Sequence, residues 1–155
     1  MSVDLVCNTG PILALGKMGV LEHLPRMGLK IVFPSAVAKE LDSGADAGFP
    51  VIRPAWIPVV DPSRNPAFEF SLDPGEAAVL ELALTLGVQR VCIDEWRGRR
   101  AAIALGLQVT GSLGLLGRMR SLGLIESLEG PINRALEAGV RYHPDLLERF
   151  LQAMN

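Results

Sequence analysis

Three short apolar runs in this chain each end at a polar residue that is followed by the start of a helix. The runs and the residues that end them are Val3–Cys7 with Asn8, Arg90–Ile93 with Asp94, and Leu107–Val109 with Thr110. Strands that alternate with helices form parallel sheets, and ligands gather at the edge where the carboxyl ends of the strands meet. The pattern therefore predicts that these polar residues share one edge of a parallel sheet.

The rest of the chain continues the alternation, with a further strand expected over Lys30–Phe33. The first expected helix has Pro11 at an early position, carries Ile12, Leu13 and Leu15, and ends near Gly19. Further helices are expected over Val20–Leu24, Ser35–Leu41, Pro74–Leu86, Glu95–Leu105, Leu113–Leu122, Pro131–Ala138 and Pro144–Ala153, with Pro25 ending the second helix and Ser43-Gly44 the third. Pro54 and Pro58 make Val51–Val60 an edge strand or a strap, because proline cannot donate to a sheet ladder. The polar segment Asp61–Phe70 is expected to be mobile.

This order of elements predicts one α/β domain over residues 1–155, a three-layer α/β/α sandwich around a central, mostly parallel sheet. A chain of 155 residues suits one domain. Its mean hydropathy of +0.31 fits strands buried on both faces, or a surface that binds a partner.

Composition also excludes several classes of protein. No apolar run reaches the length of about 18 residues that a membrane helix needs, and the N-terminus does not resemble a signal peptide. A net charge of −2 argues against non-specific nucleic-acid binding by the whole molecule. Cys7 and Cys92 fall in expected strands, where we expect buried, reduced thiols of a cytosolic protein.

Three acidic residues are candidates for chemistry, and each has a structural explanation as well. Glu76 completes a capping box with Asp73 at a helix start. Asp94 ends a buried strand, where a carboxylate is costly unless it is paired or binds a metal, although it could cap the next helix. Glu40 falls near the polar face of its helix. Asn8 adds a neutral oxygen, or else caps the helix that follows it. Glu95 is a reserve ligand.

Convergence at one edge favours a function for these acids. Crowded carboxylates repel one another, a hard cation relieves the repulsion, and oxygen ligands suit Mg²⁺ or Mn²⁺. Such a metal activates water and stabilises charge on a phosphodiester. Arginines after Asp94 could hold phosphate, or could form a solvated helix face in which Glu95 pairs with Arg99. The basic cluster comprises Arg97, Arg99 and Arg100, to which Arg118 and Arg120 could add. Thr9, Thr110 and Ser112 supply hydroxyls.

An ordered set of motifs resembles the PIN-domain family, the fold of VapC-type toxin ribonucleases. The set covers most of the chain and consists of CNTGPILALGKMG (7–19), VFPSAVAKEL (32–41), LDPGEAAVLELAL (72–84), VCIDEWRGRRAAIALGL (91–107) and VTGSLGLLGRMRSLGLI (109–125). The match is clearest to a branch of small bacterial and archaeal PIN proteins. The resemblance implies a Rossmann-like PIN fold with an acidic quartet.

By motif, Glu40, Glu76 and Asp94 occupy acidic positions of that quartet, and Asn8 stands where the family usually has aspartate. The resemblance implies a metal-dependent endoribonuclease, the toxin of a toxin–antitoxin pair, with Mg²⁺ or Mn²⁺ held by these four residues. The implied substrate contacts are Thr9, Arg97, Arg100 and Ser112. The implied partners are RNA, a cognate antitoxin and a second copy of the chain.

The departure at Asn8 leaves alternatives open. Replacing a carboxylate by an amide removes about one negative charge, although an amide oxygen can still ligate Mg²⁺. The second hypothesis is therefore a catalytically degenerate PIN fold that binds RNA or protein without cutting. A third is a small phosphate-ligand or regulatory α/β domain related by fold alone.

Overall fold

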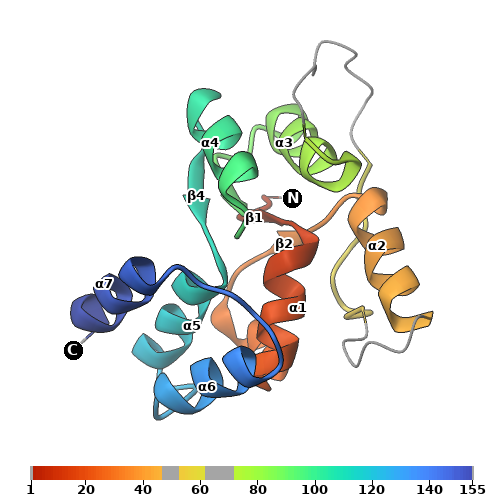
Figure 1. Cartoon of the computed structure of the whole chain (residues 1–155). Helices are drawn as coiled ribbons and strands as arrows, with labels where there is room; N and C mark the ends of the chain where they lie inside the picture. Colours follow the sequence, from red (N-terminus) through yellow and green to blue (C-terminus); the bar gives the residue numbers. More distant parts are fainter. Residues whose placement is uncertain (1, 47–52, 62–71, 155) are drawn as a thin grey trace.

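A computed structural model describes residues 2–46, 53–61 and 72–154 of the chain (Figure 1). Its sheet has four parallel strands in the order β2-β1-β3-β4. The strands are β1 (Leu5–Cys7), β2 (Ile31–Val32), β3 (Arg90–Cys92) and β4 (Gln108–Thr110). Each lies within a run predicted from the sequence, and the all-parallel pairing confirms the predicted central sheet.

Helices cover both faces of this sheet. They are α1 (Thr9–Met18), the 3₁₀ helix η1 (Leu21–Met27), α2 (Ser35–Asp46), α3 (Pro74–Leu86), α4 (Trp96–Ala104), α5 (Ser112–Ser121), α6 (Glu129–Glu137) and α7 (Pro144–Met154). Helices α1, α5 and α6 pack together on one side, and α3 and α4 lie on the other (Figure 1). The arrangement is the predicted α/β/α sandwich.

The core is aliphatic and centred on β1, where all three residues are fully buried. Cys7 and Cys92 pair in register on neighbouring strands, and both are buried free thiols. This confirms the burial and the unpaired state predicted for the two cysteines. The buried strand residues pack against apolar side chains of the surrounding helices, and burial of apolar area contributes roughly 25 cal/mol per Å² to stability.

Local signals fixed the start and the end of α3. The Asp73 carboxylate accepts a hydrogen bond of 2.8 Å from the backbone N–H of Glu76, and Pro74 takes the first helical position. Gly87 ends the helix with φ of 68°, and its N–H bonds back to the Ala83 and Leu84 carbonyls. Left-handed φ is costly for residues with a Cβ, so glycine is the natural stop.

Two predicted helix ends were wrong. The helix η1 continues through Pro25 to Met27, because burial of Leu24 and Met27 outweighs the hydrogen bond that proline lacks. Helix α2 continues through Gly44 to Asp46. Gly44 is not among the glycines with positive φ, so it costs the helix about 1 kcal/mol without ending it.

The proline-broken stretch runs along the sheet edge as a strap. Val59 forms an isolated parallel bridge with Phe33, whose N–H bonds to the Pro58 carbonyl at 3.2 Å. Residues 51–52 of the predicted strap, and 62–70 of the segment expected to be mobile, lie outside the described residues. Among the helices of the described ranges, none is long and apolar enough to cross a membrane.

Candidate active site

The carboxyl edge of the sheet brings together residues that follow different strands. Cys7 and Cys92 are register partners, and the backbone N–H of Asn8 extends the ladder to the Cys92 carbonyl at 3.0 Å. Cys92 pairs in turn with Thr110. Asn8, Asp94 and Thr110 therefore lie at the end of three adjacent strands, as the sequence pattern predicts.

Asp94 is held by the start of α5. Its Oδ1 accepts from the Ser112 backbone N–H at 2.8 Å, and its Oδ2 accepts from the Ser112 hydroxyl at 2.8 Å. Burial raises the pKa of Asp94, while the Ser112 hydrogen bonds and the nearby Arg99 charge act in the opposite direction. The alternative explanation, in which Asp94 caps the next helix, is wrong, because its carboxylate caps α5 and not α4.

A tyrosine from the C-terminal part of the chain extends this contact. The Tyr142 hydroxyl lies 2.5 Å from the Ser112 hydroxyl, which gives a hydrogen-bond chain from Tyr142 through Ser112 to Asp94. Ser112 is fully buried, and both its backbone N–H and its hydroxyl donate to Asp94. Sequence analysis missed Tyr142, since nothing near it in the chain marks a contact 30 residues away.

Glu76 is the most unusual of the candidate residues. Its side chain is only 3% exposed, and its Oε2 has no hydrogen-bond partner among the described residues. Burial raises the pKa of Glu76 to about 7, helped by a hydrogen bond to Asp73 and by the negative charges of Asp73, Glu95 and Glu40. A carboxyl group near half-ionisation at neutral pH is a common mark of a functional site.

Glu40 reaches the same side of the edge from α2. Its Oε2 accepts a hydrogen bond of 2.9 Å from the hydroxyl of Thr9, the first residue of α1. This bond joins two of the residues predicted for the site. Asn8, at the position before α1, is buried, and its side chain makes no capping bond to that helix. The capping explanation for Asn8 is therefore wrong.

Each of the three candidate acids packs against a glycine. A Cβ at Gly75 would overlap the Glu40 carboxylate, one at Gly98 would lie 2.9 Å from Glu76 Oε2, and one at Gly111 would lie 2.5 Å from Asp94 Oδ1. Close approach of backbone to a functional group is a recurrent use of glycine. These glycines are a feature of the site that the sequence alone did not reveal.

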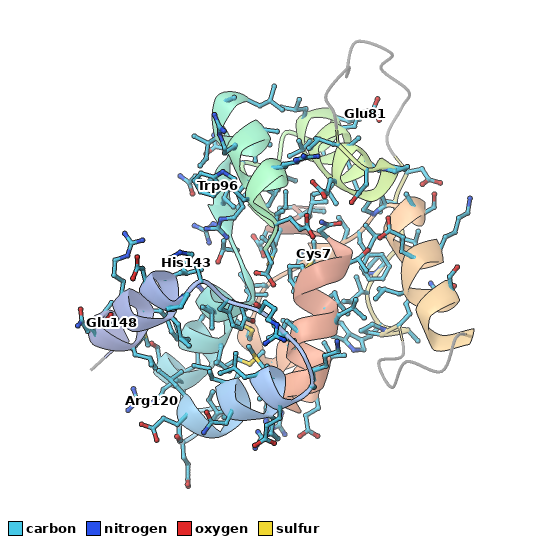
Figure 2. The ribbon with its side chains drawn as sticks, viewed as in Figure 1. Cys7, Glu81, Trp96, Arg120, His143 and Glu148 are labelled. Atoms are coloured by element: carbon cyan, nitrogen blue, oxygen red, sulfur yellow. The ribbon has the colours of Figure 1, made fainter. Side chains whose placement is uncertain are left out.

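The arginines after Asp94 divide by position. Arg97 and Arg100 are exposed on α4, and the Arg100 guanidinium lies 6.0 Å from the ring centre of Trp96. Arg99 points inward and donates to the Ile93 carbonyl at 2.9 Å, so it braces the strand end beside Asp94. Trp96 projects from α4 into solvent (Figure 2).

The carboxylate and amide oxygens at this edge are ligands of the kind that a hard cation prefers. The carboxylates, however, are not gathered tightly. Within the described ranges, no three His, Cys, Asp or Glu side chains lie close enough together to hold a metal. Glu40 and Glu76 influence each other, together with Asp73 and Glu95, whereas Asp94 is bound to Ser112. Glu76 Oε2, which has no hydrogen-bond partner among the described residues, is the oxygen best placed to accept a cation.

One comparison identifies the chain's relatives. The family model DUF3368, a PIN domain, matches residues 4–155. No curated protein and no solved structure gives a significant match. PIN domains are generally nucleases, they act on nucleic acid, and they typically use divalent metals.

Proposed function

The chain belongs to the PIN-domain family, and from this premise we propose that it is a metal-dependent endoribonuclease. Glu40, Glu76 and Asp94 are the proposed catalytic carboxylates, and with Asn8 they would hold Mg²⁺ or Mn²⁺. The observation that carries the proposal is the buried Glu76 Oε2, for which the described part of the chain offers no hydrogen-bond partner. A buried carboxylate oxygen is costly to leave unpaired, and a bound cation would remove that cost.

The electrostatics around Glu76 support the same proposal. Three neighbouring carboxylates, Asp73, Glu95 and Glu40, oppose ionisation of Glu76. A divalent cation reverses that effect, because it attracts each charge that now repels its neighbours. When bound, such a cation supplies positive charge to a phosphodiester and lowers the pKa of water.

The chain's own side chains have separate roles in the proposal. Thr9 orients Glu40 through the hydrogen bond at Oε2, and Ser112 orients both oxygens of Asp94. Arg97 and Arg100, exposed on α4 beside Trp96, bind the phosphates of the RNA backbone. Thr9 and Ser112 are therefore reinterpreted as positioning residues, while the two arginines keep the predicted substrate role.

The biological setting is also part of the proposal. We assign the protein as the toxin of a toxin–antitoxin pair that acts in the cytoplasm, with a cognate antitoxin and a second copy of the chain as protein partners. Large apolar side chains on the surface support association, among them Ile103 and Leu122. The two free buried thiols suit a reducing compartment.

RNA cleavage tests the enzymatic proposal directly. The purified chain should cleave RNA in the presence of Mg²⁺ or Mn²⁺ and should stop in chelator. The double variant Glu76→Gln and Asp94→Asn should lose cleavage by at least about a hundredfold, as expected for removing charge stabilisation from a site. The exposed Glu137→Gln is the control and should cleave normally. Cleavage in chelator, or in the double variant, would refute the mechanism.

One residue favours the second candidate, a PIN fold that binds RNA or protein without cutting. Asn8 supplies an amide where a carboxylate would strengthen the hold on a cation. RNA binding by the wild-type chain with no cleavage at any metal concentration would favour this reading. In that case Asn8→Asp is the variant in which cleavage should appear.

A further inference from the structure

A cavity of about 950 Å³ opens beside Asp94. Its walls come from α1, α4, the junction of β4 with α5, and the C-terminal segment from Val140 to Phe150. Trp96 of α4 and His143 before α7 face this side of the molecule (Figure 2). The volume lies within the range of roughly 300 to 1,000 Å³ typical of ligand sites.

The charge of this cavity is opposite to that of the molecule. Its lining includes the four cationic side chains Lys17, Arg99, Arg141 and Arg149 and the two acidic side chains Asp94 and Glu95. Four positive and two negative charges give the lining a net charge of +2, whereas the whole chain carries −2. A concave wall with a net positive charge favours an anionic ligand.

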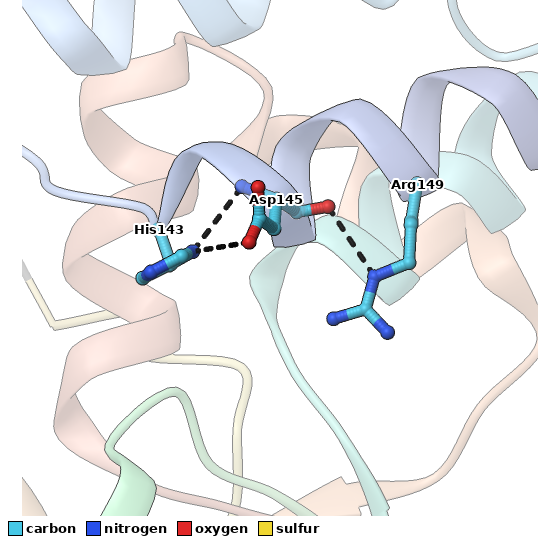
Figure 3. Close-up of polar contacts among 3 residues, drawn as sticks. All are labelled: His143, Asp145 and Arg149. Carbon is cyan, nitrogen blue, oxygen red and sulfur yellow. Dashed lines mark hydrogen bonds and ion pairs between the residues drawn. The ribbon is translucent and has the colours of Figure 1, made fainter.

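The C-terminal wall is built from a short, locally bonded segment. Figure 3 shows His143 just before α7 and Asp145 and Arg149 on the first two turns of that helix. The His143 Nδ1 accepts from the Asp145 N–H at 3.2 Å, and the Arg149 Nε donates to the Asp145 carbonyl at 3.4 Å. Asp145 itself is not part of the cavity lining. The Arg149 stem is therefore held while its terminal nitrogens carry further donors.

The same segment is coupled to the candidate active site. Tyr142 lines the cavity and also contacts Ser112, which in turn donates to Asp94. A ligand on this wall would therefore lie directly beside Asp94. Trp96, 70% exposed at the cavity, offers an aromatic face of the kind on which unpaired bases stack.

We propose that this cavity binds a stretch of single-stranded RNA, with Arg141 and Arg149 on its phosphates and Trp96 against a base. The proposal rests on the proposed function, since it gives the approach of the substrate to Asp94. The concave shape and the exposed ring favour a single strand, because duplex RNA is recognised across a broad groove and offers no free base face. An acidic protein segment is the competing occupant.

The test measures binding without cleavage. A short fluorescent single-stranded RNA is titrated with the full chain in chelator, and anisotropy is followed across roughly 50 to 200 mM salt. The double variant Arg141→Ala and Arg149→Ala removes two charges from the cavity. The control, Arg26→Ala with Arg90→Ala, removes two charges from residues outside its lining.

Each phosphate contact contributes about 0.7 to the slope of log affinity against log salt for single strands. Loss of two contacts should therefore flatten the slope by about 1.4, and over that fourfold salt range the wild type should lose about sevenfold more affinity than the cavity variant. The control should keep the wild-type slope. Trp96→Ala should weaken binding about tenfold, while Trp56→Ala on the strap should not.

Several outcomes would overturn the proposal. These are no binding of single-stranded RNA by the wild type, equal slopes for the cavity variant and the wild type, or an equal loss for a duplex of the same length. The cavity variant and its arginine control also separate the cavity assignment from the ribonuclease proposal. If cavity-dependent binding persists but the chain never cleaves, the ribonuclease proposal fails and the cavity assignment stands. If the chain cleaves RNA but the cavity variant and its arginine control bind RNA alike, the cavity assignment fails and the ribonuclease proposal stands.

Discussion

Glu76→Gln is the substitution with the clearest physical consequence. The folded protein disfavours the charged form of Glu76, whose pKa rises from 4.5 to about 7. Glutamine has nearly the same shape as glutamate and stays neutral at every pH. In metal-free buffer at pH 8, the variant should therefore be more stable than the wild type, even though it alters a buried residue of the candidate site.

The expected gain in stability follows from the size of the rise in the pKa of Glu76. Each pKa unit is worth about 1.4 kcal/mol, so a change from 4.5 to about 7 corresponds to at most about 3 kcal/mol. The three neighbouring carboxylates Asp73, Glu40 and Glu95 are exposed, and solvent weakens their repulsion. We therefore expect the variant to gain about 1 to 2 kcal/mol at pH 8.

The pH dependence has a definite sign. Between pH 4.5 and about 7 the folded wild type holds the Glu76 proton more tightly than the unfolded chain does. The stability of the wild type relative to the variant is therefore greatest below pH 4.5, falls as pH rises through about 7, and is level above it. Other groups, such as Asp94, titrate in both proteins, so their contributions cancel in the difference.

Urea unfolding followed by tryptophan fluorescence, in chelator from pH 4 to pH 8, measures this difference. Glu137→Gln, an exposed change on α6, is the control and should run parallel to the wild type. A constant difference between wild type and Glu76→Gln across the pH range would refute the reasoning. A variant that is less stable at pH 8 than at pH 4.5, relative to the wild type, would do so as well.

Three further substitutions test the geometry of the site. Gly98→Ala places a Cβ 2.8 Å from Ile93 Cγ2 and 2.9 Å from Glu76 Oε2, so it should cost about 1 to 2 kcal/mol in urea unfolding and lower metal-dependent cleavage. Tyr142→Phe removes the hydroxyl beside Ser112 and should cost about 1 kcal/mol in the same assay. Asn8→Asp should raise the affinity for Mn²⁺ in calorimetry by about tenfold, or about 1.4 kcal/mol.

Each of these has a matched comparison. Gly130→Ala on α6 meets only the end of the flexible Arg134 side chain, at 3.4 Å, and should stabilise by about 0.5 to 1 kcal/mol. A Gly98→Ala protein as stable as Gly130→Ala would contradict the packing around Glu76. An unchanged unfolding curve for Tyr142→Phe would mean that the contact with Ser112 contributes nothing. Unchanged Mn²⁺ affinity in Asn8→Asp would remove Asn8 from the proposed ligands.

The sequence predicted those features that depend on short-range chemistry. The bounds of α3 follow from Asp73, Pro74 and Gly87, whose effects act within one helical turn. The shared edge of Asn8, Asp94 and Thr110 follows from the alternation of strands and helices, since parallel strands need crossovers of one hand. Both signals are carried by neighbouring residues, so no tertiary information is needed to read them.

Features set by packing between distant segments could not be read in this way. Asp94 caps α5 because β4, which leads into that helix, pairs with β3 in the sheet. The contact joins residues that are 18 positions apart along the chain. Tyr142 reaches Ser112 from the C-terminal segment, and Pro25 stays within η1 because its neighbours are buried. The metal-binding role of Glu40, Glu76 and Asp94 remains a prediction.

Calorimetric titration of the chain with Mn²⁺ tests most directly whether the acidic edge of the sheet is a cation site. The account predicts saturable binding by the wild type at millimolar metal or below, and loss of at least tenfold in affinity, about 1.4 kcal/mol, in Glu76→Gln. Glu137→Gln should bind as the wild type does. No binding by the wild type, or equal binding by the wild type and Glu76→Gln, would contradict the account.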